Sequence, residues 1–88
     1  MTKRPPNNQD RSDELLSGLL SSPVIKRSVS ISGHSTSVSL EQPFWDELLS
    51  IVEQDKTTLS ELVAHIDAMR QINLSSALRL YILYRLKS

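Results

Sequence analysis

Few side chains in this sequence have the chemistry that catalysis or metal binding needs. It has two histidines and no cysteine. His65 follows Glu61 by four residues, a spacing that places both on one helix face as an ion pair or as two metal ligands. A zinc site needs at least three protein ligands, and no third lies nearby in the sequence. His34 falls in a predicted turn, where a surface histidine is expected. We therefore predict no catalytic residue, no metal and no cofactor, and a protein that is not an enzyme.

Alternating serines are the second chemical signal, and they predict a β-hairpin. The apolar residues Val29 and Ile31 stand at odd positions, whereas Val38 and Leu40 stand at even positions. A two-residue turn at Gly33–His34, of type II′ with Gly33 at positive φ, would explain this change. It would pair Val29 with Val38. The opposite face would carry Ser28, Ser30, Ser32, Ser35, Ser37 and Ser39, either as a solvated surface or as a flat hydrogen-bonding surface for a ligand of repeating polarity.

Three helices are expected after the hairpin. Pro43 suits the start of the first, because the missing N–H costs nothing there, and this helix should end near Gln54–Asp55. Thr58 and Glu61 fit a capping box for the second helix, and Asn73 can cap the third. The third helix is apolar on almost all sides, which on so short a chain indicates a subunit interface. The expected fold class is α+β, with a short strand or hairpin followed by three helices.

Composition indicates one small domain. The chain has 88 residues, ten basic and ten acidic side chains, and no apolar run near the ~20 residues that span a bilayer. We expect a cytoplasmic protein without membrane contact, and a homodimer, because a small core without disulfides usually needs a partner. Residues 1–11 are expected to form a disordered tail, residues 12–23 a short amphipathic helix, and residues 24–88 the main domain. Residues 12–22 of this helix would bind a protein partner. The contact would be made by the apolar stripe Leu15, Leu16, Leu19 and Leu20.

Three sequence blocks carry a resemblance to a known family. They are TSVSL at 36–40, FWDEL at 44–48 and LSELV at 59–63. In this order they resemble the ribbon-helix-helix DNA-binding superfamily of the Arc/MetJ type. The longer blocks GHSTSVSLEQPFWDEL and NLSSALRLYIL resemble a bacterial subgroup with an added C-terminal helix. The resemblance covers about residues 26–86.

The resemblance implies an intertwined homodimer that places a β-ribbon in the major groove of double-stranded DNA. Ser35, Ser37 and Ser39 would face the bases. Thr58 and Ser60, at a helix N-terminus, would hold a phosphate, with Lys26 and Arg27 as further phosphate contacts. The dimer interface is expected to use Val38, Leu40, Leu78, Tyr81 and Ile82.

Two functions follow from these observations. The first is a sequence-specific DNA-binding transcriptional regulator that acts as a homodimer. The alternative is a protein–protein interaction module, antitoxin-like or an adaptor, that uses the same dimer scaffold without specific DNA binding. Two features weaken the first function. Residues 31–88 hold five basic against seven acidic side chains, and a four-stranded sheet made from two hairpins is too wide for the major groove. Either residues 24–33 form a loose arm in the DNA-binding form, or the fold serves another function. The alternative rests on the zero net charge, the all-serine face and the leucine stripe of residues 12–22.

Overall fold

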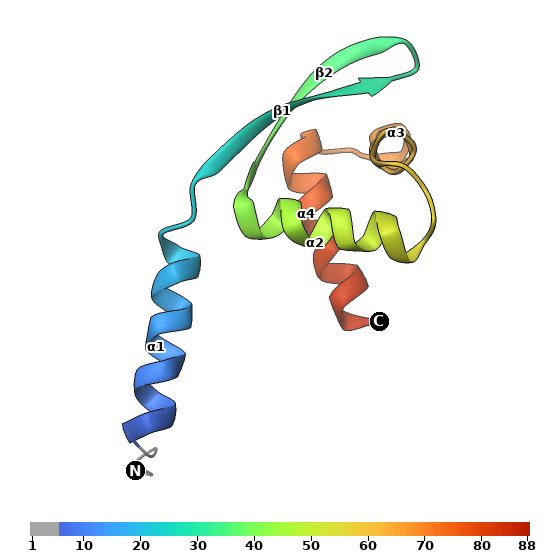
Figure 1. Ribbon diagram of the computed structural model, residues 1–88. Coiled ribbons are helices and arrows are strands. Elements are labelled where there is room, and N and C mark those ends of the chain that lie inside the picture. The colour runs from blue at the N-terminus through green and yellow to red at the C-terminus, as the bar shows by residue number, and fades with distance from the viewer. Residues whose placement is uncertain (1–5) are drawn as a thin grey trace.

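A β-hairpin covers one side of a small group of helices (Figure 1). The computed structural model describes residues 6–88, and the side chains of residues 11–88. The elements are α1 (Pro6–Leu20), β1 (Val24–Ile31), β2 (His34–Glu41), α2 (Gln42–Gln54), α3 (Leu59–Met69) and α4 (Leu74–Lys87). The expected α+β class, with a hairpin and three following helices, is confirmed.

The hairpin turn lies one residue earlier than the sequence analysis placed it. Ser32 has a φ of 49° and Gly33 a φ of 84°, so both central residues are left-handed and the turn resembles type I′ rather than type II′. Val29 therefore pairs with Thr36, and the predicted pairing with Val38 is wrong. Moving the turn by one residue shifts each partner by two, so every side chain keeps the face that the alternation assigned to it.

The same substitution at the two glycines should have opposite effects on stability. An added Cβ at Gly33 or at Gly18 would meet no atom within 4 Å, so only the backbone decides the outcome. Gly33→Ala should lower the free energy of unfolding by about 1–2 kcal/mol, because an alanine is strained at positive φ. Gly18→Ala should instead favour the α1 helix by about 0.5–1 kcal/mol. Urea unfolding and the helical circular dichroism signal measure the two effects, and a neutral Gly33→Ala would contradict this turn.

The core lies between the inner face of the hairpin and helices α2, α3 and α4. Trp45 is its largest side chain and is completely buried. The indole Nε1–H donates a hydrogen bond of 2.9 Å to the backbone carbonyl of Ile25 in β1, which ties α2 to the hairpin. The other fully or nearly buried residues are Val29, Val38, Leu40, Leu48, Ile51, Leu62, Val63, Ile66, Leu78 and Ile82.

The helix starts follow the local signals in the sequence. Pro43 lies in the first turn of α2. The Thr58 hydroxyl accepts the Glu61 N–H at 3.1 Å, and the Asn73 side chain accepts the Ser76 N–H at 2.9 Å. The Glu61 carboxylate accepts a hydrogen bond of 2.9 Å from the Thr57 hydroxyl, and not from His65. These caps satisfy backbone donors that would otherwise be unpaired at the helix starts.

Helix α1 projects from the rest of the fold, which stretches the molecule to 54 × 26 × 25 Å. The helix begins at Pro6, six residues before the predicted start at residue 12, so residues 6–11 of the expected tail are helical. The rest of that tail, residues 1–5, lies outside the described residues. Across residues 6–88, none of the helices combines the length and the apolar character that crossing a membrane requires.

Candidate nucleic-acid interface

The outer face of the hairpin is a polar surface made of cross-strand pairs. Ser28 lies opposite Ser37, Ser30 opposite Ser35, and Lys26 opposite Ser39. Ser39 is half-buried and the others are exposed. We call these six residues the serine face. Ser32, which was expected here, lies in the turn instead. Because the inner face of the same strands packs on the core, the backbone that carries the serine face is held in place.

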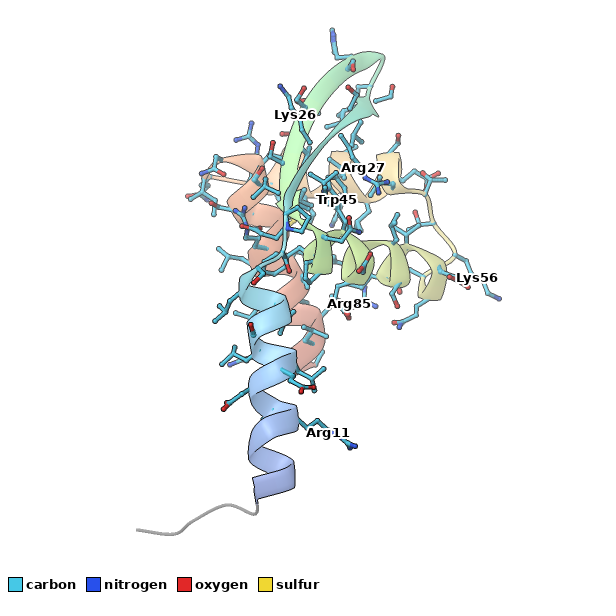
Figure 2. All side chains as sticks on the ribbon, turned by 60° about the vertical axis from the view of Figure 1, so that its left-hand side comes forward. Arg11, Lys26, Arg27, Trp45, Lys56 and Arg85 are labelled. Carbon is cyan, nitrogen blue, oxygen red and sulfur yellow. The ribbon has the colours of Figure 1, made fainter. Side chains whose placement is uncertain are left out.

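Lys26 and Arg27, which the sequence analysis grouped as phosphate contacts, lie on opposite faces of β1. Lys26 belongs to the serine face, whereas Arg27 pairs with Val38 on the inner side. The Arg27 guanidinium carbon lies 5.2 Å from the centroid of the Trp45 ring, a cation–π contact (Figure 2). The structure therefore brings Lys26 together with the serines and directs Arg27 to the edge of the core.

The start of α3 places Thr58 and Ser60 close to a negative charge. The Thr58 hydroxyl is already the helix cap, and Ser60 is half-buried. Glu61 lies in the first turn, where its carboxylate interacts favourably with the helix dipole. That same carboxylate opposes a phosphate at this helix end, so the phosphate site implied by the resemblance is electrostatically weaker than expected.

Two arginines of α4 neutralise acids of the same chain. Arg79 contacts Glu41 at 3.0 Å, and Arg85 holds both carboxylate oxygens of Asp55, the shorter contact being 2.6 Å. The pKa of Glu41 is lowered by its backbone hydrogen bond first and by Arg79 second. The Arg85 hydrogen bond lowers the pKa of Asp55, and the pKa of Arg85 is raised in return. These arginines link α4 to the hairpin end and to the loop after α2.

The lowered Asp55 pKa makes stability depend on pH in a defined direction. A carboxyl whose pKa is lower in the folded state stabilises the fold above its unfolded pKa and loses this contribution as pH falls through the folded value. Asp55→Asn should therefore lower stability slightly at pH 7 and flatten the loss of stability below about pH 4. Urea midpoints at pH 7 and pH 3 measure this. Glu53→Gln, at an exposed carboxylate of α2, is the control, and identical pH profiles for all three proteins would contradict the prediction.

Four of the five residues expected at the dimer interface belong to the core of a single chain. Val38, Leu40, Leu78 and Ile82 are at most 1% exposed, and Tyr81 is half-buried. They are buried because the inner face of the hairpin and helices α2, α3 and α4 pack together around them. In this conformation these four side chains leave almost no surface for a partner, and the expected dimer interface stays a prediction. The expected partner-binding leucines of α1 are all exposed.

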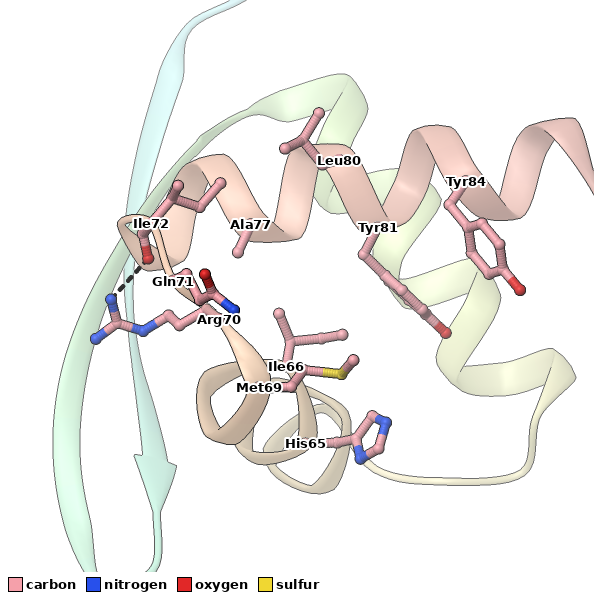
Figure 3. A pocket seen from close by; sticks show the side chains of 10 residues that line it. All are labelled: His65, Ile66, Met69, Arg70, Gln71, Ile72, Ala77, Leu80, Tyr81 and Tyr84. Carbon is pink, nitrogen blue, oxygen red and sulfur yellow. Dashed lines mark hydrogen bonds between the residues drawn. The ribbon is translucent and has the colours of Figure 1, made fainter.

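Sequence reasoning missed an apolar groove between α3 and α4 (Figure 3). Its volume is about 630 Å³. His65, Met69 and Arg70 line it from α3 and the following residue, and Leu80, Tyr81 and Tyr84 line it from α4. Arg70 is held at 2.7 Å from Asp67 and at 2.8 Å from the Ile72 carbonyl. The sequence signal for this groove was that α4 is apolar on almost all sides. Within the described part of the chain, no three His, Asp or Glu side chains are grouped as metal ligands would be.

The hairpin followed by helices, with a polar outer face, defines a fold typical of DNA-binding regulators. Residues 24–86 match the family model of the ribbon-helix-helix domain, and the chain belongs to this family. A solved structure of an uncharacterized protein from Bordetella pertussis Tohama I is 33% identical to the chain, with a TM-score of 0.61. The match covers 75% of this chain but only 58% of that one. None of the curated proteins matches. The predicted superfamily is thus confirmed.

Proposed function

We propose that the protein is a sequence-specific DNA-binding transcriptional regulator whose ribbon is the hairpin of one chain. The observation that carries this proposal is the serine face, which combines exposed hydroxyls and one lysine on a ribbon of the family fold. Two strands about 4.8 Å apart fit a major groove about 12 Å wide. Four strands do not fit, so two copies that bind together would be joined at a surface other than their strands.

The proposed contacts divide into those that recognise bases and those that bind phosphate. Ser35, Ser37 and Ser39 would face base edges, where a hydroxyl donates or accepts a hydrogen bond. Lys26 would contact the backbone together with Thr58 and Ser60 at the start of α3. The chain has no net charge. We therefore expect weak binding to non-specific DNA. The preference for the specific DNA sequence would then depend on few contacts.

The proposal is tested by selecting bound fragments from sheared genomic DNA at two salt concentrations. A short inverted repeat that stays bound at the higher salt is the expected result, and its half-site spacing would report the geometry of two joined copies. No duplex binding even at low salt would refute the proposal. The chain would work in the bacterial cytoplasm, where its DNA is found.

Lys26→Ala should weaken binding to every duplex and reduce the dependence of affinity on salt by about one ion per bound lysine. Arg11→Ala is the control for the loss of one positive charge, because Arg11 lies on α1, far from Lys26 and from the start of α3 (Figure 2). Fluorescence anisotropy with a labelled duplex measures both variants over a salt series. Equal losses for the two variants would indicate a general charge effect and not a contact at the serine face.

The exposed leucines of α1 favour a second candidate function, a protein–protein interaction module. Leu15, Leu16, Leu19 and Leu20 lie outside the matched family region, and each is at least 52% exposed. Residues 12–22 would then bind a protein partner, as in an antitoxin or an adaptor. Co-purification from the native host tests this function. Recovery of the chain alone would contradict it.

A further inference from the structure

We infer that the groove between α1, α2 and α4 binds a basic amphipathic helix of another protein. The groove has a volume of about 600 Å³ and is separate from the groove between α3 and α4. Leu19 and Leu20 line it from α1, Phe44 lines it from α2, and Ile82 and Leu86 line it from α4. The inference goes beyond DNA binding and rests on the second candidate function, a protein–protein interaction module.

The apolar walls of this groove are left uncovered by the chain itself. Leu19, Leu20, Val24 and Leu86 are large apolar side chains, yet they are 58% to 78% exposed. Beyond the groove α1 leaves the body of the protein, so the other two leucines of its stripe extend the apolar surface along the helix (Figure 1). A partner helix fits such an elongated surface better than a compact small molecule does, because its side chains recur on one face every three or four residues.

The charges in the groove select a basic partner. Its ten lining residues include two acids, Glu41 and Glu47, and no base. Glu41 is already paired with Arg79. Glu47 is half-buried, and within residues 11–88 no Lys, Arg or His side chain forms an ion pair with it. A lysine or arginine of the partner helix would supply the missing opposite charge, beside apolar walls that limit screening by water.

The same carboxylate argues against a second copy of the chain in this groove. Copies related by a two-fold axis bring the same patch of each copy together. Two grooves that face each other would place Glu47 beside its equivalent, and like charges in contact are unfavourable. An acidic partner helix would meet the same repulsion. A helix with leucines on one face and lysines or arginines beside them complements both the apolar walls and the free carboxylate.

Two synthetic peptides test the charge and the apolar contact separately. Both have about 14 residues, roughly four helical turns, with leucines at helical spacing. One peptide has lysine at the remaining positions and the other has glutamate. Fluorescence anisotropy of each labelled peptide, titrated with the full chain in the absence of DNA, measures the two affinities. We expect the lysine peptide to bind about tenfold more tightly, because only its charge complements Glu47.

Glu47→Gln should lower the affinity for the lysine peptide about fivefold, the upper range for a partly exposed ion pair, without weakening the glutamate peptide. Glu53→Gln is the matched control, because it removes an exposed carboxylate of the same helix outside the groove. Leu20→Ala should weaken both peptides about tenfold, because it removes part of an apolar wall. The Leu20 side chain is 78% exposed, so this variant should keep the helical circular dichroism signal.

Equal affinities for the two peptides, or equal losses in Glu47→Gln and Glu53→Gln, would overturn the inference of a basic partner. Co-purification from the native host tests the interaction module itself and does not depend on that result. Absence of binding by either peptide would also overturn the inference and would leave the DNA selection unaffected. Sedimentation velocity identifies a second copy as the occupant. A dimer that dissociates in Leu20→Ala would show a contact between copies at this groove and would overturn the inference as well.

Discussion

Trp45→Ala is expected to lower the free energy of unfolding by about 3–5 kcal/mol, enough to unfold much of a small domain. The Trp45 side chain is completely buried between the hairpin and the helices. Its removal would leave a cavity and would also leave the Ile25 carbonyl without its indole donor. Arg27 would lose the ring over which its guanidinium lies. Urea unfolding followed by far-ultraviolet circular dichroism measures the loss without relying on tryptophan fluorescence.

Two further variants separate the contributions of the Trp45 side chain. Trp45→Phe keeps an aromatic ring but removes the N–H, so we expect an intermediate loss of about 1–3 kcal/mol. Leu49→Ala removes a partly exposed side chain from the same helix and should cost less than either. If Trp45→Ala were no more damaging than Leu49→Ala, the central position of Trp45 in the core would be contradicted.

Ser37→Glu is expected to reduce duplex affinity at least a hundredfold if the serine face enters the major groove. Ser37 lies opposite Ser28 in the middle of this face and is exposed. A carboxylate there would be brought close to the phosphates, and a like-charge contact in an interface costs several kcal/mol. The fold should be little affected, because the side chain points away from the core. Anisotropy measured with the selected duplex gives the affinity of each variant.

The control for Ser37→Glu adds the same charge at another exposed serine. Ser50 lies on α2, outside the hairpin. Ser50→Glu should change affinity only slightly, through the long-range charge that salt screens. If both variants bind the duplex as the unmodified chain does, DNA does not contact the serine face. If both lose affinity equally, the effect comes from net charge alone.

The local elements of the fold could be read from the sequence because short-range interactions specify them. The alternation of Val29, Ile31, Val38 and Leu40 places these side chains on the inner face in either hairpin register. Thr58 and Asn73 cap their helices through hydrogen bonds that span three residues. A capping side chain needs only its own first turn, so no knowledge of the remaining fold was required.

The assembly of the candidate site depends on how the two strands pair and pack on the helices. The turn lies at Ser32–Gly33, because two left-handed residues match the twist of the paired strands. This register then directed Lys26 to the serine face and Arg27 toward Trp45.

The family blocks, the three helices after the hairpin and the two faces of the hairpin follow from the order of the residues alone. Which apolar residues are buried together depends on how distant segments of the chain pack. Val38, Leu40, Leu78 and Ile82 are buried within one chain, and the leucines of α1 stay exposed. An apolar stripe in a sequence indicates that its surface must be buried. Many apolar surfaces, in the same chain or in another, would bury it equally well. The choice among them depends on packing between segments that are distant in the chain.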